Sequence, residues 1–310
     1  MIYKKPLFIC LFIFTAPIFY FFTLYIDLYP LKLAFEPLKK QIPIIVYHGI
    51  EKQTKIEHNL SVKDFVQQME FLKKNKFNPI TIREYIKILN GSIQIPQNPV
   101  ILTFHDSHRG HYDYVFKYLK RYEFKASFFI VANWTRDNGR KWTLSWKEIR
   151  EINNYKNHEG IDLFDIEAHS LDHYNFTRTN NETIQKFKDR VEKDIASTRS
   201  IIKDNIGEPP EVFSLPSGTR GYGWKDSQEY QIITKLLKKH NYNGLQTGRY
   251  FTQNPWSLSG ISIHNISTKE LEFNFILNHG KNSNYFSDFL KWLITIIDRL
   301  IYKVLFLLMN

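Results

Sequence analysis

Short apolar runs alternate with stretches of helical spacing between residues 41 and 278 of the chain. The apolar runs are short enough to be buried strands and occupy residues 42–47, 99–104, 127–132, 161–168 and 212–215. Apolar residues at helical spacing predict helices over residues 62–74, 182–203 and 230–240. Strands that alternate with helices favour a parallel sheet or barrel. Since no repeat or low-complexity linker interrupts the pattern, we expect one α/β domain over residues 41–280.

The first thirty residues are predicted to anchor the chain in a membrane. Residues 6–26 contain no charged side chain. As a helix they would span about 31 Å, which is the hydrocarbon thickness of a bilayer. Lys4 and Lys5 precede this stretch and no small-residue cleavage site follows it, so we expect an uncleaved anchor over residues 1–30. The charges on either side do not determine its orientation.

Residues 285–310 are predicted to form an amphipathic helix. Polar residues recur there at helical spacing, and apolar residues fall on the opposite side. Charged residues interrupt the apolar stretch, which argues against a second membrane span. Two placements stay open for this helix, on the membrane surface or over the core of the domain.

Composition narrows the possible partners. The 310 residues include 42 Lys or Arg and 31 Asp or Glu, which gives a net charge of +11. This positive charge is dispersed without a run of five basic residues, so we do not expect nucleic-acid binding. Dispersed charge is typical of solvated faces, or of proteins attracted to an anionic cell envelope. The single cysteine, Cys10, excludes a disulfide scaffold within the chain.

Candidate metal ligands follow two of the predicted strands. His105 and Asp106 come directly after the second apolar run, and His169 and His173 come after the fourth. In a parallel barrel, the carboxyl ends of the strands converge on one face. We expect the spacing of four to place both imidazoles on the same side of a helical turn. With Asp106 they would form a three-ligand set with open positions for water, as in catalytic zinc or similar divalent sites.

Further segments carry a resemblance to a known family. They are Pro-Ile-Ile-Val-Tyr-His-Gly-Ile at 43–50, Phe-Lys-Ala-Ser-Phe-Phe-Ile-Val at 124–131, Leu-Ser-Trp at 144–146, the run at 166–173 that ends in His-Ser-Leu-Asp-His, and Val-Phe-Ser-Leu-Pro-Ser-Gly at 212–218. In this order they resemble the polysaccharide deacetylases of the NodB-homology type, carbohydrate esterase family 4, over about residues 41–270. The first segment is similar to the branch that includes poly-N-acetylglucosamine deacetylases. The resemblance implies a deformed (β/α) barrel and a hydrolase that cleaves the amide of N-acetylated sugars.

The resemblance also implies a metal and catalytic groups. Asp106, His169 and His173 would hold a divalent metal, most simply zinc, with cobalt, nickel or manganese as alternatives. The backbone N–H of Ser217 would stabilise the oxyanion. His48 and His264 are both candidates for the acid that protonates the leaving amine, and we favour His48 because it ends the first strand.

Three residues depart from the family pattern, and one of them, Ser217, replaces an aromatic residue. His105 stands where the family has the Asp that acts as the general base, and Ser214 stands where much of the family has an Arg that braces this base. An imidazole, with an ordinary pKa of about 6.5, is able to accept the proton but brings no negative charge to hold the water. Two alternatives therefore stay open: His105 acts as the general base of an active enzyme, or it marks a degenerate, inactive site. His108 and His111 are either extra ligands or loop residues that face solvent.

These observations predict a membrane-anchored, metal-dependent N-deacetylase. Its substrate would be an N-acetylhexosamine polymer of a bacterial cell envelope, and its catalytic domain would lie on the extracytoplasmic side of the bilayer. The aromatic residues able to stack on sugar rings are Trp142, Trp146, Tyr222, Trp224, Tyr250 and Trp256, of which Tyr222 and Trp224 are the best placed, although most are expected in the core. The alternative is a catalytically degenerate glycan-binding module that supports polysaccharide assembly. The sequence identifies no protein partner.

Overall fold

The computed structural model describes residues 42–56, 58–216, 227–247, 258–259 and 261–262. All of them lie within one compact unit that spans Gln41–Lys281. The predicted anchor at 1–30 and the predicted amphipathic helix at 285–310 lie outside these residues. Within the described ranges, no helix combines the length and the apolar character needed to cross a bilayer.

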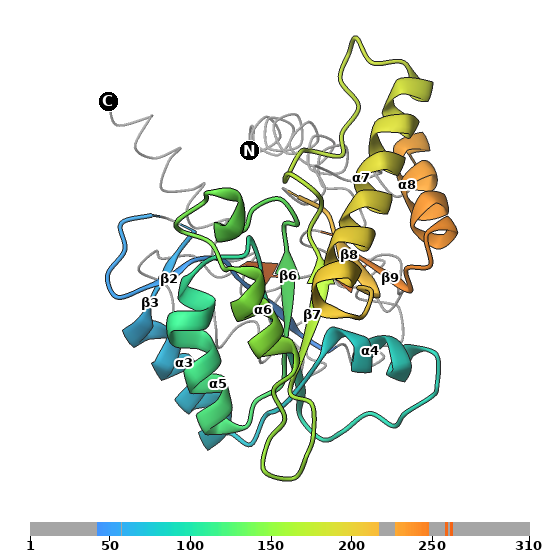
Figure 1. Ribbon diagram of the computed structural model, residues 1–310. Helices are drawn as coiled ribbons and strands as arrows, with labels where there is room; N and C mark the ends of the chain where they lie inside the picture. The colour runs from blue at the N-terminus through green and yellow to red at the C-terminus, as the bar shows by residue number, and fades with distance from the viewer. Residues whose placement is uncertain (1–41, 57, 217–226, 248–257, 260, 263–310) are drawn as a thin grey trace, which may run out of the picture. The chain divides into compact units, whose positions relative to one another are not determined.

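A parallel sheet forms the centre of the fold (Figure 1). Its strands run in the order β10-β9-β8-β7-β6-β5-β1-β11, and β4 pairs with β5 beside this path. Their bounds are β1 Ile44–Tyr47, β4 Asn78–Ile80, β5 Pro99–Phe104, β6 Ala126–Ile130, β7 Phe164–Ala168, β8 Val212–Ser214, β9 Gly244–Thr247, β10 Leu258–Ser259 and β11 Ile261–Ser262. Two short strands, β2 (Ile50–Glu51) and β3 (Leu60–Ser61), form a separate parallel pair. The predicted α/β parallel architecture is confirmed.

The two edges of the sheet lie close together. β10 pairs with β9 and β11 pairs with β1, although a single residue separates β10 from β11 in the chain. Two residue steps span at most about 7 Å, so the sheet must curl to bring its edges together. With helices packed against it, the curled sheet forms a half-barrel of the (β/α) type.

Six α-helices lie within the described residues: α3 Val62–Lys74, α4 Ile82–Leu89, α5 Phe116–Tyr122, α6 Trp146–Asn153, α7 Ile184–Ile206 and α8 Gln228–Lys239. A π-helical turn, η1 (His111–Val115), leads into α5, and a 3₁₀ turn, η2 (Arg136–Asn138), precedes α6. The helix predicted over residues 62–74 is found with those bounds. The strand predicted over 161–168 is shorter, because Ile161 is exposed and Asp162 pairs with Lys156 instead of with β6.

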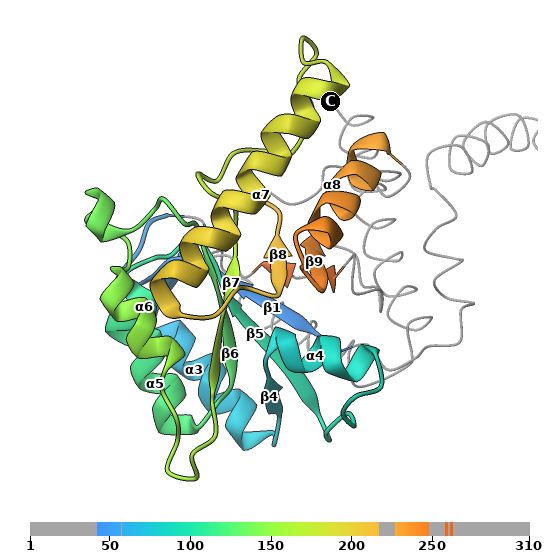
Figure 2. The same ribbon diagram turned by 45° about the vertical axis from the view of Figure 1, so that its right-hand side comes forward.

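The two faces of the sheet bury different side chains. On the outer face, α3, α5, α6 and α7 cover a large apolar cluster (Figure 2). On the inner face, α4 places Ile82, Tyr85 and Ile86 against a smaller cluster that includes Ile101 of β5 and Phe129 of β6. Successive residues of a strand point to opposite faces, so a fully buried strand contributes to both clusters.

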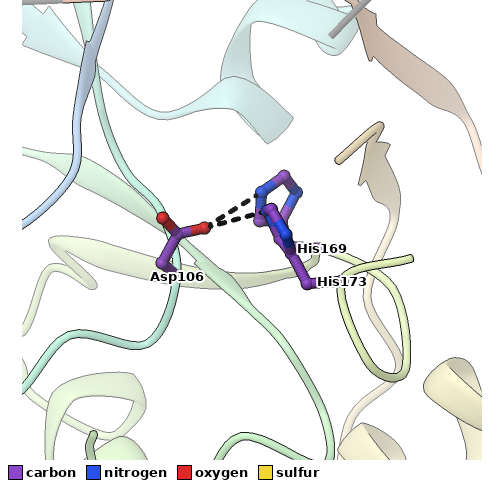
Figure 3. A group of neighbouring side chains, drawn as sticks. All are labelled: Asp106, His169 and His173. Carbon is purple, nitrogen blue, oxygen red and sulfur yellow. Dashed lines mark ion pairs between the residues drawn. The ribbon is translucent and has the colours of Figure 1, made fainter. Parts of the chain in front are cut away.

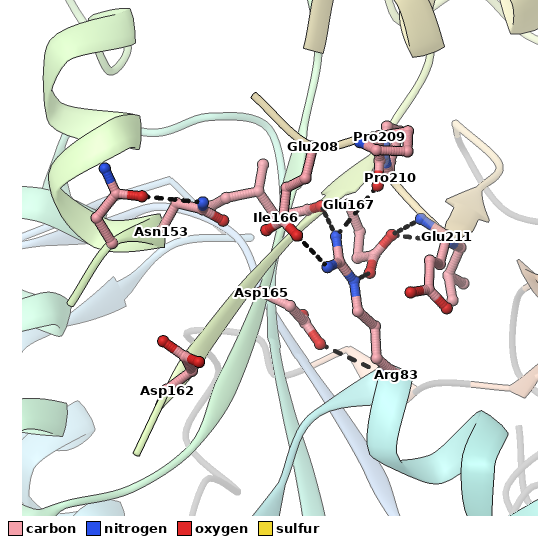
Figure 4. Close-up of polar contacts among 12 residues, drawn as sticks. Arg83, Asn153, Asp162, Asp165, Ile166, Glu167, Glu208, Pro209, Pro210 and Glu211 are labelled. Carbon is pink, nitrogen blue, oxygen red and sulfur yellow. Dashed lines mark hydrogen bonds and ion pairs between the residues drawn. The ribbon is translucent and has the colours of Figure 1, made fainter. Parts of the chain in front are cut away.

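A charged network also lies between α4 and the sheet (Figure 4). Nε of Arg83 is 2.6 Å from Oε1 of Glu167, whose side chain is fully buried in β7. The second carboxylate oxygen of Glu167 accepts hydrogen bonds from the backbone N–H groups of Glu211 and Val212, at 2.8 and 2.7 Å. Burial raises the pKa of Glu167, and the guanidinium of Arg83 opposes this rise. Glu167 therefore ties both α4 and the start of β8 to the strand that ends at His169.

Candidate metal centre

Asp106, His169 and His173 meet at the carboxyl ends of two strands (Figure 3). Asp106 follows β5 and His169 follows β7, with β6 between these two strands. Oδ1 of Asp106 lies 3.3 Å from Nε2 of His169 and 3.3 Å from Nε2 of His173. One ligand atom from each residue lies within 4.8 Å of the other two. The structure therefore brings together the three residues that the sequence predicted as metal ligands.

The spacing of these atoms suits a small divalent cation. Ligands at 2.0–2.1 Å from a tetrahedral zinc are about 3.3 Å apart. Both Asp106–histidine distances have this value. His169 is buried, whereas Asp106 and His173 keep part of their side chains exposed. Solvent therefore reaches part of the group, although Oδ1 of Asp106, the atom that faces both imidazoles, is itself buried.

A backbone carbonyl fixes the protonation of His169. Nδ1 of this ring lies 2.9 Å from the carbonyl oxygen of Ser214, and a carbonyl only accepts, so Nδ1 carries the proton. In the neutral ring, Nε2 then presents its lone pair toward the carboxylate of Asp106. Two lone pairs at 3.3 Å repel unless a proton or a cation lies between them. This second contact of His169 is the kind that orients histidine ligands in metal sites.

The loop that carries the two histidines is not helical, so the prediction of a helical turn is wrong. Ser170 and His173 have left-handed backbone angles, φ 70° and φ 60°. Oγ of Ser170 accepts a hydrogen bond from the backbone N–H of His173 at 2.8 Å, and the carboxylate of Asp194 on α7 accepts one from Leu171 at 3.0 Å. These hydrogen bonds fold the loop back on itself, which is how residues four apart present their rings to the same point.

The loop that carries Asp106 is also unusual. Asp106 and Ser107 have φ 68° and φ 53°, in the left-handed region that non-glycine residues seldom occupy. Ser107 is fully buried, and its hydroxyl accepts a hydrogen bond from the backbone N–H of Val131 at 3.0 Å. Burial alone would raise the pKa of Asp106, but its close contacts with the imidazoles of His169 and His173 lower the pKa below its ordinary value. The site therefore holds Asp106 as a carboxylate.

His105 and His48 lie beside this group. The ring centroid of His105 is 4.7 Å from that of His169 and 5.8 Å from that of His48, which follows β1. His105 is buried, and its Nε2 has no hydrogen-bond partner among the residues that the structure covers. Burial and then the neighbouring His169 lower the pKa of His105 well below its ordinary value. His105 is therefore a neutral imidazole next to the candidate metal ligands.

His108 and His111 do not join the ligand group. Nε2 of His111 lies 2.7 Å from the backbone carbonyl oxygen of His48, and burial, followed by the neighbouring His108, lowers the pKa of His111 to about 3. His108 lies 3.5 Å from a carboxylate oxygen of Glu51 and accepts a hydrogen bond from the backbone of Gly110. His111 is thus a buried structural residue rather than one that faces solvent. The predicted oxyanion donor, Ser217, and the second acid candidate, His264, lie outside the described residues.

Sequence reasoning missed several residues that build this site. Ser107 and Asp194 support the two ligand-bearing loops, and the ring of Trp134 packs 5.0 Å from the ring of His173. Ser214 was noted only as a missing arginine, whereas its carbonyl orients His169. Their hydrogen bonds join positions far apart in the chain, and no spacing pattern in the sequence marks such pairs.

Residues 93–243 match a protein family described as polysaccharide deacetylase. The chain is 21% identical over 207 residues to poly-beta-1,6-N-acetyl-D-glucosamine N-deacetylase of Escherichia coli (strain K12), a match that covers 56% of this chain and 30% of that protein. A Staphylococcus aureus (strain MRSA252) protein of the same name is 21% identical over 202 residues, which cover 64% of this chain and 65% of the relative. The chain thus spans less than a third of the length of the Escherichia coli relative.

Among solved structures, the fold is similar to that of a de-N-acetylase from Aggregatibacter actinomycetemcomitans. The TM-score is 0.61 at 17% sequence identity, and the match covers 75% of this chain and 99% of that chain. At this identity the likeness bears on the fold alone, and it agrees with the parallel half-barrel described above.

Proposed function

We propose that this protein is a metal-dependent N-deacetylase of an N-acetylhexosamine polymer, because residues 93–243 match the polysaccharide deacetylase family. One observation carries the proposal. Asp106, His169 and His173 place three ligand atoms at spacings that suit a tetrahedral cation, and Asp106 and His173 are partly exposed. The names of the two relatives point to poly-β-1,6-N-acetylglucosamine as the substrate class.

We assign the metal to these three ligands and favour zinc, since two imidazoles and one carboxylate suit that ion. When bound, the metal would polarise the acetamide carbonyl and lower the pKa of a coordinated water. Ser214 would keep the Nε2 lone pair of His169 directed at the site, because its carbonyl oxygen accepts the Nδ1 proton. The left-handed loops would hold Asp106 and His173 at the distances that binding needs.

We propose His105 as the general base and His48 as the general acid. The supporting observation is that the centroid of the neutral His105 ring lies 4.7 Å from that of His169 and 5.8 Å from that of His48. A neutral imidazole keeps one acceptor nitrogen, so His105 is able to take a proton from water at neutral pH. Ser217 remains the proposed oxyanion donor, and His264 remains the alternative acid.

We further propose that residues 1–30 anchor the protein in the membrane with its catalytic domain outside the cytoplasm of a bacterial cell. The uncharged stretch at 6–26 supports an anchor. A polymeric substrate in the cell envelope supports the extracytoplasmic placement.

Acetate release from β-1,6-linked N-acetylglucosamine oligomers, measured together with bound metal, tests the proposed function. We expect the zinc-loaded full chain to release acetate and His169→Ala to lose most of its metal and roughly 100-fold or more in rate. His158→Ala is the matched control, because His158 is an exposed histidine paired with Glu123. A metal-loaded protein that releases no acetate would refute the enzyme, and glycan affinity without turnover would favour the binding module.

His105→Asp then tests the base within the same assay. General base catalysis contributes about 10²–10⁴-fold in rate. If His105 is adapted as the base, the aspartate variant loses rate at unchanged metal content. If the variant gains rate strongly, the native protein is a weakened enzyme.

A further inference from the structure

We infer that Trp142 is a stacking platform for a sugar ring of the bound glycan, next to the Asp106–His169–His173 group. The inference rests on the proposed function for the identity of its ligand. It adds a substrate contact on the loop between β6 and α6, which Figure 1 shows leaving the same end of the sheet as the loop after β7.

Exposure distinguishes two aromatic residues near the candidate metal centre, Trp142 and Tyr174. Most large apolar side chains in the described part of the chain are buried, and the exposed ones there are four isoleucines, Trp142 and Tyr174. Trp142 is 44% exposed and Tyr174 is 67% exposed. Tyr174 directly follows the ligand His173, and Trp142 is linked to this ligand through Trp134. Both exposed aromatic residues therefore adjoin the candidate metal centre.

A continuous series of ring contacts connects Trp142 to the metal ligands. The ring centroid of Trp134 is 5.0 Å from that of His173, with 32° between the planes. The indole of Trp142 meets Trp134 edge to face at 5.5 Å. The guanidinium of Arg140 lies 4.5 Å from the Trp134 ring centroid. Trp134 thus packs against His173, Trp142 and Arg140, whereas Trp142 keeps 44% of its surface exposed and accessible to a ligand.

The backbone around Trp142 is rigid and tied to the Asp106 loop. The carbonyl oxygen of Trp142 accepts a hydrogen bond from the N–H of Arg109 at 2.9 Å. Two residues further on, the N–H of Leu144 donates to the carbonyl oxygen of Ser107 at 2.8 Å. Ser107 is adjacent to Asp106, so the platform and the carboxylate are positioned by the same pair of loops. A platform fixed before binding loses little conformational entropy when the ligand arrives.

The chemistry of the loop favours a sugar over a lipid surface. The residues before Trp142, from Asp137 to Lys141, are exposed and polar or glycine, so the indole is an isolated aromatic face rather than part of an apolar patch. Membrane contacts require a broader apolar surface. A hexosamine ring presents one flat C–H face, which matches a single indole, and its hydroxyl and acetamide groups suit the polar surroundings.

Affinity for β-1,6-linked N-acetylglucosamine oligomers, measured by calorimetry on the zinc-loaded full chain, tests this inference independently of turnover. We expect Trp142→Ala to weaken binding roughly three- to tenfold and to raise KM by a similar factor, with the loss in KM rather than in kcat. Trp142→Phe should recover most of the affinity. Ile161→Ala is the matched control, because Ile161 is 41% exposed but precedes β7, at the opposite end from His169. Equal metal content in all variants shows that the site is intact.

The outcomes separate this inference from the proposed function. Weaker binding in Trp142→Ala without acetate release from any form would support the platform and refute the deacetylase. Normal acetate release with unchanged affinity and KM in Trp142→Ala would overturn the platform and leave the deacetylase standing. A wild-type protein that binds no oligomer would overturn the platform. So would a Trp142→Ala protein that loses only its binding to phosphatidylglycerol vesicles, which would assign the indole to a lipid contact.

Discussion

Replacing Arg83 with methionine is expected to destabilise the domain strongly, because the change leaves a buried carboxylate without its partner. Glu167 is fully buried, and Arg83 provides its only counter-charge within 4.0 Å among the described residues. Arg83 also donates to the carbonyl oxygen of Ile166 at 3.0 Å, which would lose this donor (Figure 4). Breaking one side of a buried ion pair costs about 3–5 kcal/mol.

If the unpaired carboxylate of Glu167 causes the loss of stability, this loss should depend on pH. Burial raises the pKa of Glu167 and Arg83 opposes the rise, so the variant raises this pKa further. A group whose pKa is higher in the folded state than in the unfolded state loses stability as pH rises. With Arg83 in place this pKa is about 8, so the deficit of Arg83→Met should change little between pH 5 and 7 and should grow as pH rises above about 8.

Urea unfolding monitored by tryptophan fluorescence measures this effect, and the midpoint should fall by about 1–3 M above pH 8, where Glu167 is ionised in the wild type. Glu208→Gln is the control, because Glu208 is the 46% exposed partner of Arg83 and should contribute less than about 1 kcal/mol. Adding Glu167→Gln to Arg83→Met should recover at least half of the loss, since the amide oxygen still accepts the two backbone N–H groups. A deficit below about 1 kcal/mol, or one that does not change with pH, would refute the reasoning.

Two further predictions concern a loop support and the anchor. Burial raises the pKa of Asp194 to about 6. As pH rises from about 4 to 6, the wild type should therefore lose stability relative to Asp194→Asn, by at most about 3 kcal/mol. Parallel stability curves for the two proteins would contradict this assignment. Deleting residues 1–30 should move the protein from the membrane fraction to the soluble fraction of lysed cells, because residues 6–26 carry no charge; a deleted protein that stays with the membranes would show that the anchor lies elsewhere.

The strands, and the meeting of Asp106, His169 and His173, could be predicted because buried strands appear in the sequence as short apolar runs. The run at 99–104 is apolar on both faces, and β5 has those bounds. Parallel strands then bring their carboxyl ends together, which was enough to group Asp106 with His169 and His173.

Features that depend on long-range polar contacts could not be predicted. Nothing in the local sequence pairs Arg83 with Glu167, and α4, which carries Arg83, was not expected at all. The His169–His173 spacing matched a helix, but hydrogen bonds from Ser170 and Asp194 give that loop a different path. Local periodicity predicts elements, whereas such hydrogen bonds depend on where distant segments meet.

The left-handed residues in the two ligand loops have a consequence for anyone who wishes to transplant this site. Each such residue costs roughly 1–2 kcal/mol that a free peptide has no means to recover. A segment copied from around His169 to His173 would therefore adopt another shape, unlike a helix-borne histidine pair, which keeps its geometry in any stable helix. The proposed cation affinity would belong to the entire folded domain, so chelators and denaturants should act on the same equilibrium.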